Sequence, residues 1–301
     1  MHLRSVLVAA SAVLTLAGCE VNLNSEGIVS RETKSFTVSG PPDVDVATFD
    51  GAIEIHSWAR NEVEIEIEKR AMEQRLVDEI KVVAEQQGNK IVLKVSGPSR
   101  YESKGIQIGV NFSPSARLRI ALPRQSQLTA KSNDGSITIE DVTGKITLNT
   151  GDGSVRATRV SGELMVRSGD GAIRMDGVEG KLDLETDDGS IAGEAKPSVL
   201  RAHTGDGSIR IEVHADSQMA EDWDVQTADG SVVLTLPGDF SGEVDAESRD
   251  GAVRASHPAI KAETRDGEDR EERRRAMKAT LGAGGKTLRV RTGDGSIRIE
   301  S

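Results

Sequence analysis

The chain has 301 residues, of which 36% are hydrophobic and only 2% aromatic, and its formal net charge is −11. Aromatic rings dominate ordinary globular cores and the surfaces that stack on sugars or bases, so their scarcity predicts a thin interior of Val, Ile, Leu and Ala. The acidic charge excludes the nucleic-acid-binding class, which needs clustered basic residues to displace counterions from phosphates.

Residues 1–18 have the pattern of a bacterial signal peptide. The apolar run Val6–Leu16 is too short to span a bilayer. It leads into Leu16-Ala17-Gly18-Cys19, which resembles the lipobox of bacterial lipoproteins, and the resemblance implies that Cys19 carries the lipid and is the first residue of the mature protein. The alternative is a secretory signal with an incidental cysteine. Because Glu20 and not Asp follows the cysteine, the outer membrane is expected over the inner one.

The segment between the signal peptide and the repeats divides into two parts. Residues 19–33 are polar and show no sustained period, which predicts a short tether. Residues 34–123 are expected to form the irregular, β-rich N-terminal part of the repetitive domain, since stretches such as 116–122 alternate apolar and polar residues. Within this part, one or two helical turns are expected at 71–79 and a β-hairpin at Gln87-Gly88-Asn89.

An 18-residue repeat dominates residues 124–301. Its marker is Ser/Thr-x-Asp-Gly-Ser/Ala-Ile/Val, and the first five Asp-Gly pairs begin at Asp134, Asp152, Asp170, Asp188 and Asp206. A strict short period requires each unit to pack in register on the next one, so the pattern predicts a stacked fold. The spacing then loosens, and residues 265–285 form a charged insertion in which we expect a short exposed helix.

Each repeat contains two short segments that alternate apolar and polar residues, such as Ile137-Thr138-Ile139 and Ile146-Thr147-Leu148. This is the two-residue period of a strand with one buried face. Glycine recurs about every nine residues, as at Gly135 and Gly144, and is expected to reverse the chain through a positive φ. We predict an all-β fold, a parallel β-solenoid of the β-helix or β-roll type with 18-residue, two-strand coils. The alternative is an antiparallel meander that turns every nine residues.

The lipobox, the irregular β-rich start and the repeated DGSI.I...G.I.L segments together resemble the bacterial β-strand-repeat family known as "putative adhesin", a domain of unknown function. The resemblance covers about residues 34–301. It implies a β-solenoid at the cell surface or in the periplasm, and it transfers no site residues.

The repeat would place its Asp side chains in a row. Carboxylates about 5 Å apart repel by roughly 1 kcal/mol in a water-like dielectric. One interpretation is a calcium ion between coils, with Asp134, Asp152, Asp170, Asp188 and Asp206 as the candidate ligands. The alternative is an Asx-type turn, in which each carboxylate accepts the backbone N–H two residues on. The pattern favours the turn, because the second corner of each coil is not acidic.

The sequence predicts no catalytic residues. Arg156, Arg174, Arg210 and Arg298 share one column and are expected to form an exposed row. The His residues lack metal-ligand spacing, and no Ser lies in Gly-x-Ser-x-Gly. The row of Arg beside the Asp corners superficially resembles calcium-dependent polysaccharide-cleaving β-helices, but the period alone explains the placement.

The expected function is that of a non-enzymatic, lipid-anchored β-solenoid of the cell envelope, adhesin-like, with a face that binds envelope proteins or glycans and without a required cofactor. The outer membrane is favoured, with the protein facing the periplasm or exposed at the surface. The alternatives are a periplasmic structural or envelope-stress scaffold and a metal-assisted polysaccharide lyase. A localised site is expected where the period fails, at residues 68–123, 216–224 and 265–285.

Overall fold

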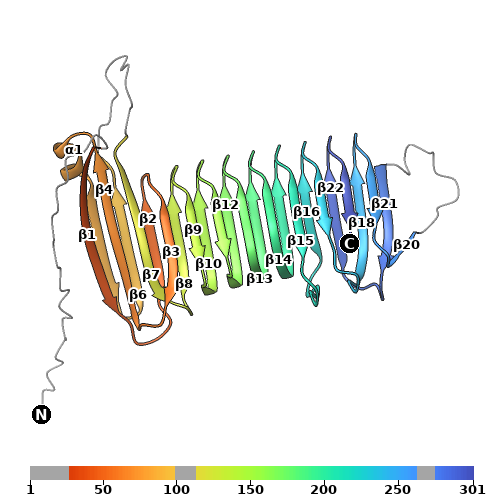
Figure 1. Ribbon diagram of the computed structural model, residues 1–301, viewed down its shortest axis with the longest axis horizontal. Helices are drawn as coiled ribbons and strands as arrows, with labels where there is room; N and C mark the ends of the chain where they lie inside the picture. The colour runs from red at the N-terminus through yellow and green to blue at the C-terminus, as the bar shows by residue number, and fades with distance from the viewer. Residues whose placement is uncertain (1–26, 99–112, 263–274) are drawn as a thin grey trace, which may run out of the picture.

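The chain forms an elongated β-rod with a short helix at its N-terminal end (Figure 1). The computed structural model describes residues 27–98, 113–262 and 275–301. The expected signal peptide, Cys19 and the first part of the expected tether therefore lie outside the described residues. Within the described ranges, no helix is long and apolar enough to cross a membrane.

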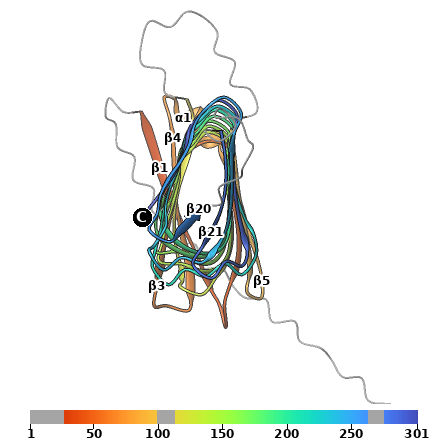
Figure 2. The same ribbon diagram turned by 90° about the vertical axis from the view of Figure 1, so that its right-hand side faces the viewer.

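The rod has two long sides that face each other across the core (Figure 2). The first side contains β2 (Asp43–Thr48), β8 (Gln127–Ser132), β10 (Thr143–Thr150), β12 (Ser161–Ser168), β16 (Trp223–Thr227), β22 (Thr287–Thr292) and β18 (Gly242–Ser248). The second side contains β3 (Ile53–Trp58), β9 (Ile137–Glu140), β11 (Val155–Thr158), β15 (Ile209–Val213), β17 (Val232–Thr235), β23 (Ile297–Glu300) and β19 (Val253–Ser256). Two longer strands, β13 (Ile173–Thr186) and β14 (Ile191–Thr204), contribute to both sides.

Neighbouring coils pair in parallel. In the regular coils, residues that lie opposite each other are 18 positions apart in the sequence, as the repeat predicts. Val155 lies opposite Ile137 of the preceding coil and Ile173 of the following one. The predicted parallel β-solenoid with two-strand coils is confirmed. The antiparallel meander is wrong for these coils, because a meander would pair residues across each nine-residue turn.

The predicted apolar columns form the core. Ile137, Val155 and Ile173 are at most 1% exposed, and they stack directly on one another. Each buried aliphatic side chain of this size stabilises the fold by about 1.5 to 3 kcal/mol, which a single isolated coil could not obtain. A further buried column, Val142, Val160 and Val178, fills the corner opposite the Asp-Gly pairs.

Antiparallel strands close the N-terminal end of the rod. There β1 (Ile28–Thr37) pairs with β4 (Glu62–Ala71), which pairs with β7 (Ser115–Pro123). The predicted hairpin is confirmed as β5 (Lys81–Gln87) and β6 (Lys90–Ser96), with Gly88 at a φ of 62° in the turn. The predicted helical turns are confirmed as α1 (Gln74–Glu79).

Residues 28–33, expected in the tether, form the first part of β1 instead. The strand is hard to see in the sequence because two of its inward-facing positions, Glu32 and Lys34, are charged and a third is Ser30. Glu32 of β1 accepts Lys69 Nζ of β4 at 2.8 Å and Lys34 Nζ at 3.2 Å. Inward-pointing, ion-paired residues on an edge strand discourage pairing with another chain.

The order of the coils along the rod differs from their order in the sequence. The final coil, β22 and β23, lies between the coil of β16 and β17 and the coil of β18 and β19 (Figure 1). The order also differs at the N-terminal end, where β2 lies between β6 and β8, two strands that both follow it in the sequence.

The C-terminal end is closed on its first side by two further strands. There β21 (Ala276–Leu281) pairs antiparallel with β18 and with β20 (Ile260–Ala262). The expectation of a helix within 265–285 is therefore wrong for residues 276–281, whose backbone completes the sheet next to β18. Residues 265–274 of the insertion lie outside the described parts of the chain.

Candidate binding surface

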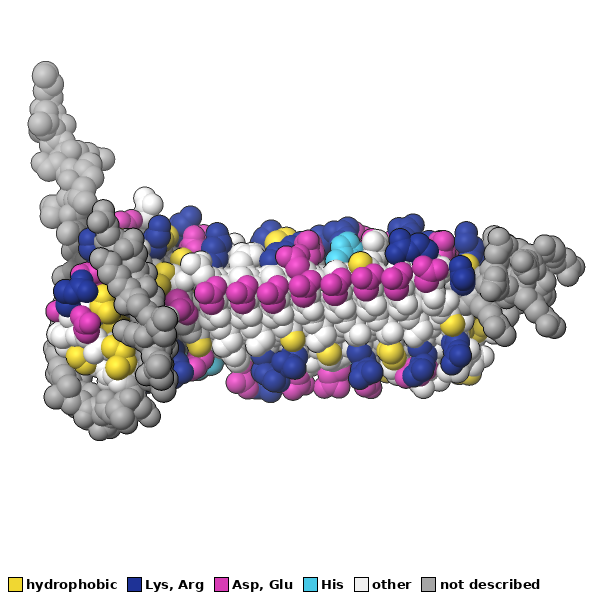
Figure 3. Space-filling model, turned by 90° about the horizontal axis from the view of Figure 1, so that it is seen from above, with side chains coloured by type: hydrophobic (Ala, Val, Ile, Leu, Met, Phe, Trp, Pro, Cys, Tyr) yellow, Lys and Arg dark blue, Asp and Glu magenta, His cyan; other side chains and the backbone are white. Residues whose placement is uncertain are grey.

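A row of aspartates runs along the Asp-Gly corner of the rod and forms an unbroken acidic line in Figure 3. The stacking of the following glycines gives the order of nine coils, Asp50, Asp134, Asp152, Asp170, Asp188, Asp206, Asp229, Asp294 and Asp250. Burial and the charge of Asp134 raise the pKa of Asp50, and a hydrogen bond from the Gly51 backbone opposes them. The five Asp residues considered as calcium ligands thus lie side by side, one to each coil.

The row brings carboxylates together in line and not around a common centre. Among the described residues, no group of three or more His, Cys, Asp or Glu is placed to hold a metal ion. Calcium in proteins takes six to eight oxygen ligands. A calcium ion between coils would therefore draw mainly on water and backbone carbonyls.

Buried hydroxyls, and not the carboxylates, hold the Asp-Gly corner. Thr186 Oγ1 accepts the N–H of Gly189 in its own coil at 3.2 Å and donates to the carbonyls of Gly169 and Gly171 in the preceding coil at 2.7 and 3.1 Å. The same link to the preceding coil recurs at Ser132, Thr150, Ser168, Thr204, Thr227, Thr292 and Ser248. The Asx-type turn is thus replaced by a Ser/Thr turn that also joins coils.

The alternation of inward and outward residues along each strand could have predicted that these hydroxyls are buried. Ser132 follows Leu128 and Ala130 at a two-residue spacing, and all three are buried. The position therefore points inward, where a lone hydroxyl needs partners.

The glycine of each Asp-Gly pair is required for close approach between coils. A Cβ on Gly189 would overlap the carbonyl oxygen of Gly171 in the preceding coil. The sequence predicts a positive φ at both corners, but the Asp-Gly glycines of the regular coils do not have one. Positive φ values occur at the opposite corner, where Gly144, Gly162 and Gly180 have φ values of 148°, 111° and 112°. The two corners thus select glycine for different reasons.

The second side carries an exposed row of arginines, as predicted. Arg156, Arg174 and Arg210 are exposed, and no carboxylate of the described residues lies within 4.0 Å of their guanidinium nitrogens. Arginines of the first side differ, because Arg167 and Arg291 each contact acidic residues at 2.7 to 3.5 Å. The row is therefore available to an external acidic group, and its members share one solvent face.

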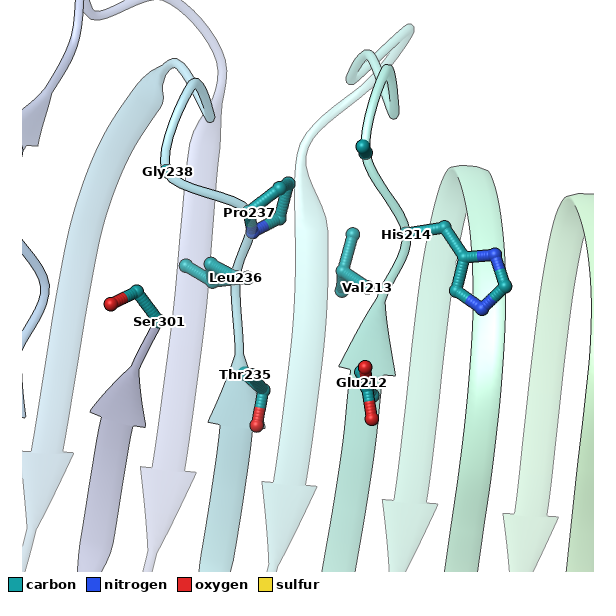
Figure 4. A pocket seen from close by; sticks show the side chains of 9 residues that line it. Glu212, Val213, His214, Thr235, Leu236, Pro237, Gly238 and Ser301 are labelled. Carbon is teal, nitrogen blue, oxygen red and sulfur yellow. The ribbon is translucent and has the colours of Figure 1, made fainter.

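Two hollows flank the segment at 216–224, where the period fails. One, of about 470 Å³, lies between the ends of β15 and β17 and includes Leu236, Pro237 and Ser301 (Figure 4). His214 borders this hollow, but its ring points away from Pro237, and its Nε2 lies 3.3 Å from Glu194. The other, of about 390 Å³, is lined by polar groups that include Lys196 and Gln218.

A third hollow lies at the C-terminal end of the arginine row. Its volume is about 580 Å³, and its lining is Arg254, Ala255, Ser256, Arg298 and Glu300. The sequence placed Arg298 in the exposed row but did not single out Arg254, because the loosened spacing hides their adjacency. The register pairs the two residues directly across neighbouring coils.

Histidine and tryptophan have structural roles. Buried His257 accepts the N–H of Ala259 at Nδ1, which leaves Nε2 to donate to the carbonyl of Pro237 at 3.0 Å. Trp223 is fully buried against Phe240, with ring centroids 5.4 Å apart. Both side chains hold the irregular corners in place.

The chain is similar to solved structures from several bacteria. A "putative adhesin" of Parabacteroides merdae is 12% identical, with 90% of this chain and 96% of that chain covered and a TM-score of 0.46. A "putative cell adhesion protein" of Clostridium sporogenes is 17% identical, with 90% and 99% covered and a TM-score of 0.31. A "putative lipid binding protein" of Parabacteroides distasonis is 14% identical, with 90% and 97% covered and a TM-score of 0.40.

No curated protein matches the chain in sequence. The family model described as Toastrack DUF4097 matches residues 42–300, which include every coil of the rod. The resemblance to a β-strand-repeat domain of unknown function is thereby confirmed, and the chain belongs to the Toastrack DUF4097 family.

Proposed function

We propose that the protein is a non-enzymatic, lipid-anchored component of the cell envelope that presents the faces of its rod to an envelope protein or glycan, in the manner of an adhesin. The observation that carries the proposal is the unbroken register of nine Asp-Gly corners. Repetition of one coil places similar solvent-facing side chains at many successive levels, which suits an extended partner better than a single small substrate.

The arginine row is the proposed contact face. Arg156, Arg174 and Arg210 have no ion pair to break among the described residues, so binding an acidic group there costs no internal contact. A planar guanidinium can also donate two parallel hydrogen bonds to a carboxylate or phosphate.

Anchoring is tested by labelling cells with palmitate. The label is expected in the wild-type protein and is expected to be absent from Cys19→Ala. Equal incorporation into both proteins, or none into the wild type, would refute the anchor. That result would not count against partner binding by the purified rod, which is tested separately.

Contact through the arginine row is tested by crosslinking envelopes and capturing the protein. The triple variant R156E/R174E/R210E is expected to lose its specific partner. The matched control K131E/K145E/K181E makes the same charge change on the first side and is expected to keep it. If both triple variants capture the same partner as the wild type, the row is not the contact face.

A further inference from the structure

The hollow at the C-terminal end of the arginine row is lined by two arginines, a serine, a glutamate and an alanine. Arg254 of β19 and Arg298 of β23 are register partners on adjacent strands, and both are exposed. Both line the hollow of about 580 Å³, together with Ser256 and Glu300. Two guanidinium groups therefore border one concave space.

Two acidic residues close to these arginines in the chain are engaged elsewhere, while Glu300, two residues after Arg298, lines the hollow itself. Asp294 lies 3.2 Å from the guanidinium of Arg249. Asp250 lies 3.9 Å from Arg249 and 3.8 Å from Arg275. Among the described residues, no carboxylate lies within 4.0 Å of the nitrogens of Arg254 or Arg298, so their charges are not neutralised by an ion pair.

The hollow also reaches an open strand edge. Within the described residues β19 pairs only with β23, so its other edge has no neighbouring strand. Val253 and Ala255 of β19 are accordingly only partly buried, whereas Ile297 and Ile299 beside them are at most 1% exposed. The site thus combines positive charge, hydroxyl and carboxylate groups and a small apolar surface.

We propose that this hollow binds a sugar phosphate, with Arg254 and Arg298 holding the phosphate group. A phosphate monoester carries a charge of about −1.5 to −2 at neutral pH, which matches two guanidinium groups. Ser256 and Glu300 supply a hydroxyl and an acceptor for sugar hydroxyls. The volume exceeds what a bare phosphate ion needs and falls within the range of small-molecule sites.

The inference rests on the proposed binding function and narrows its glycan partner to a phosphorylated one. The ligand could be a free sugar phosphate or a phosphomonoester on a larger glycan, and the recognition chemistry is the same for both.

The test is calorimetric titration of the purified protein with glucose 6-phosphate, glucose and inorganic phosphate at low ionic strength. We expect glucose 6-phosphate to bind at least about tenfold more tightly than either of the other two, since only it uses both halves of the site. A phosphorylated oligosaccharide, compared before and after phosphatase treatment, distinguishes the sources. If the intact oligosaccharide binds more tightly than glucose 6-phosphate, the glycan is the ligand; the reverse order identifies the free sugar phosphate.

Two double variants identify the residues. R254Q/R298Q is expected to weaken binding about tenfold or more, and R254K/R298K nearly as much, because lysine keeps the charge but loses the planar fork. The control K131Q/K145Q removes two charges from the first side and is expected to keep the affinity within about twofold. Melting curves of all variants verify folding, and the Lys variant, which keeps the charge, remains informative if the Gln variant does not fold.

Three results would overturn the site. They are no binding of glucose 6-phosphate at about 10 mM, equal affinity for inorganic phosphate and glucose 6-phosphate, and full affinity in R254K/R298K. The first two would leave the envelope capture result standing, so failure of this site and failure of the proposed function are distinguishable.

Discussion

Thr292 Oγ1 donates a hydrogen bond of 2.8 Å to the carbonyl of Gly230, a residue 62 positions earlier in the chain. On the other side of the same coil, Ser248 Oγ donates to the carbonyl of Gly295 at 2.8 Å. The last coil is therefore held between two coils that precede it in the sequence. During folding, the coil of β18 and β19 therefore cannot pack directly on the coil of β16 and β17, because the final coil occupies the position between them.

A chain that ends at residue 286 should lose far more stability than a chain shortened by one internal repeat. Truncation removes β22 and β23 and exposes the core surfaces of two coils that are not adjacent. Deletion of residues 151–168 removes one full turn and joins Thr150 to Gly169 in the original register. Circular dichroism melting should show a cooperative transition for the internal deletion and a strongly lowered or absent one for the truncation. Equal melting temperatures would mean that the neighbouring coils close the gap.

Replacing Thr186 with Val should lower the free energy of unfolding by about 1 to 3 kcal/mol. The substitution keeps the shape but leaves the N–H of Gly189 and the carbonyl of Gly171 without the hydroxyl, whereas the carbonyl of Gly169 keeps its backbone donors. Thr147→Val serves as the control, because Thr147 lies on the outer face and has no side-chain hydrogen bond among the described residues. Urea unfolding should place the control within about 0.5 kcal/mol of the wild type. A similar loss in both variants would count against the hydroxyl link.

Gly189→Ala should be among the most destabilising single changes in the rod. The new methyl group would overlap the carbonyl of Gly171, which is fixed by the stacking of the coils. Relief requires adjacent coils to separate, and overpacking of this kind costs about 1 to 3 kcal/mol or more. At Gly238 nothing lies within 4 Å of the added methyl, so Gly238→Ala should melt close to the wild type. Equal melting of the two variants would show that the corner is pliable.

The repeated part of the fold follows from the sequence because identical columns must stack on identical columns. The 18-residue spacing alone assigns Ile137, Val155 and Ile173 to one buried row. The coil order at the two ends could not be assigned in this way. Val232, Val253 and Ile297 fit the same column equally well, so side-chain pattern does not say which of them are neighbours.

The candidate site was only partly predictable for a related reason. Glycine appears identical in sequence whether it is needed for a positive φ, as at Gly162, or for close approach, as at Gly189. The pairing of Arg254 with Arg298 depends on the inserted final coil, which joins residues 44 positions apart. Local patterns carry no information on such a pairing.

Glu68 should make the N-terminal end of the rod sensitive to acid. Burial alone would raise the pKa of its carboxyl, but the hydrogen bond and charge of Arg31, with the charges of Arg117 and Arg70, lower the pKa below its ordinary value overall. A carboxyl with a lowered folded-state pKa contributes stability that is present above its unfolded pKa and is lost as pH falls through the folded value.

Glu68→Gln should therefore be less stable than the wild type at neutral pH, and its stability should fall less steeply between about pH 5 and pH 3. Exposed Glu85, which has no ion pair among the described residues, provides the control as Glu85→Gln. Unfolding by urea across this pH range measures both slopes. Parallel curves for Glu68→Gln and the wild type would show that Glu68 does not carry the acid sensitivity.

Removal of calcium should leave the melting temperature unchanged. Each gap in the aspartate row offers one carboxylate from each of two coils, as between Asp152 and Asp170, and the corner itself is held by hydroxyls that need no metal. Added sodium chloride should instead stabilise the rod slightly by screening repulsion along the row, with equal ionic strength giving equal effects for sodium and calcium salts. Asp170→Asn should melt at or slightly above the wild-type temperature. A rise of several degrees with millimolar calcium that a chelator reverses and Asp170→Asn abolishes would show instead that the row binds the ion.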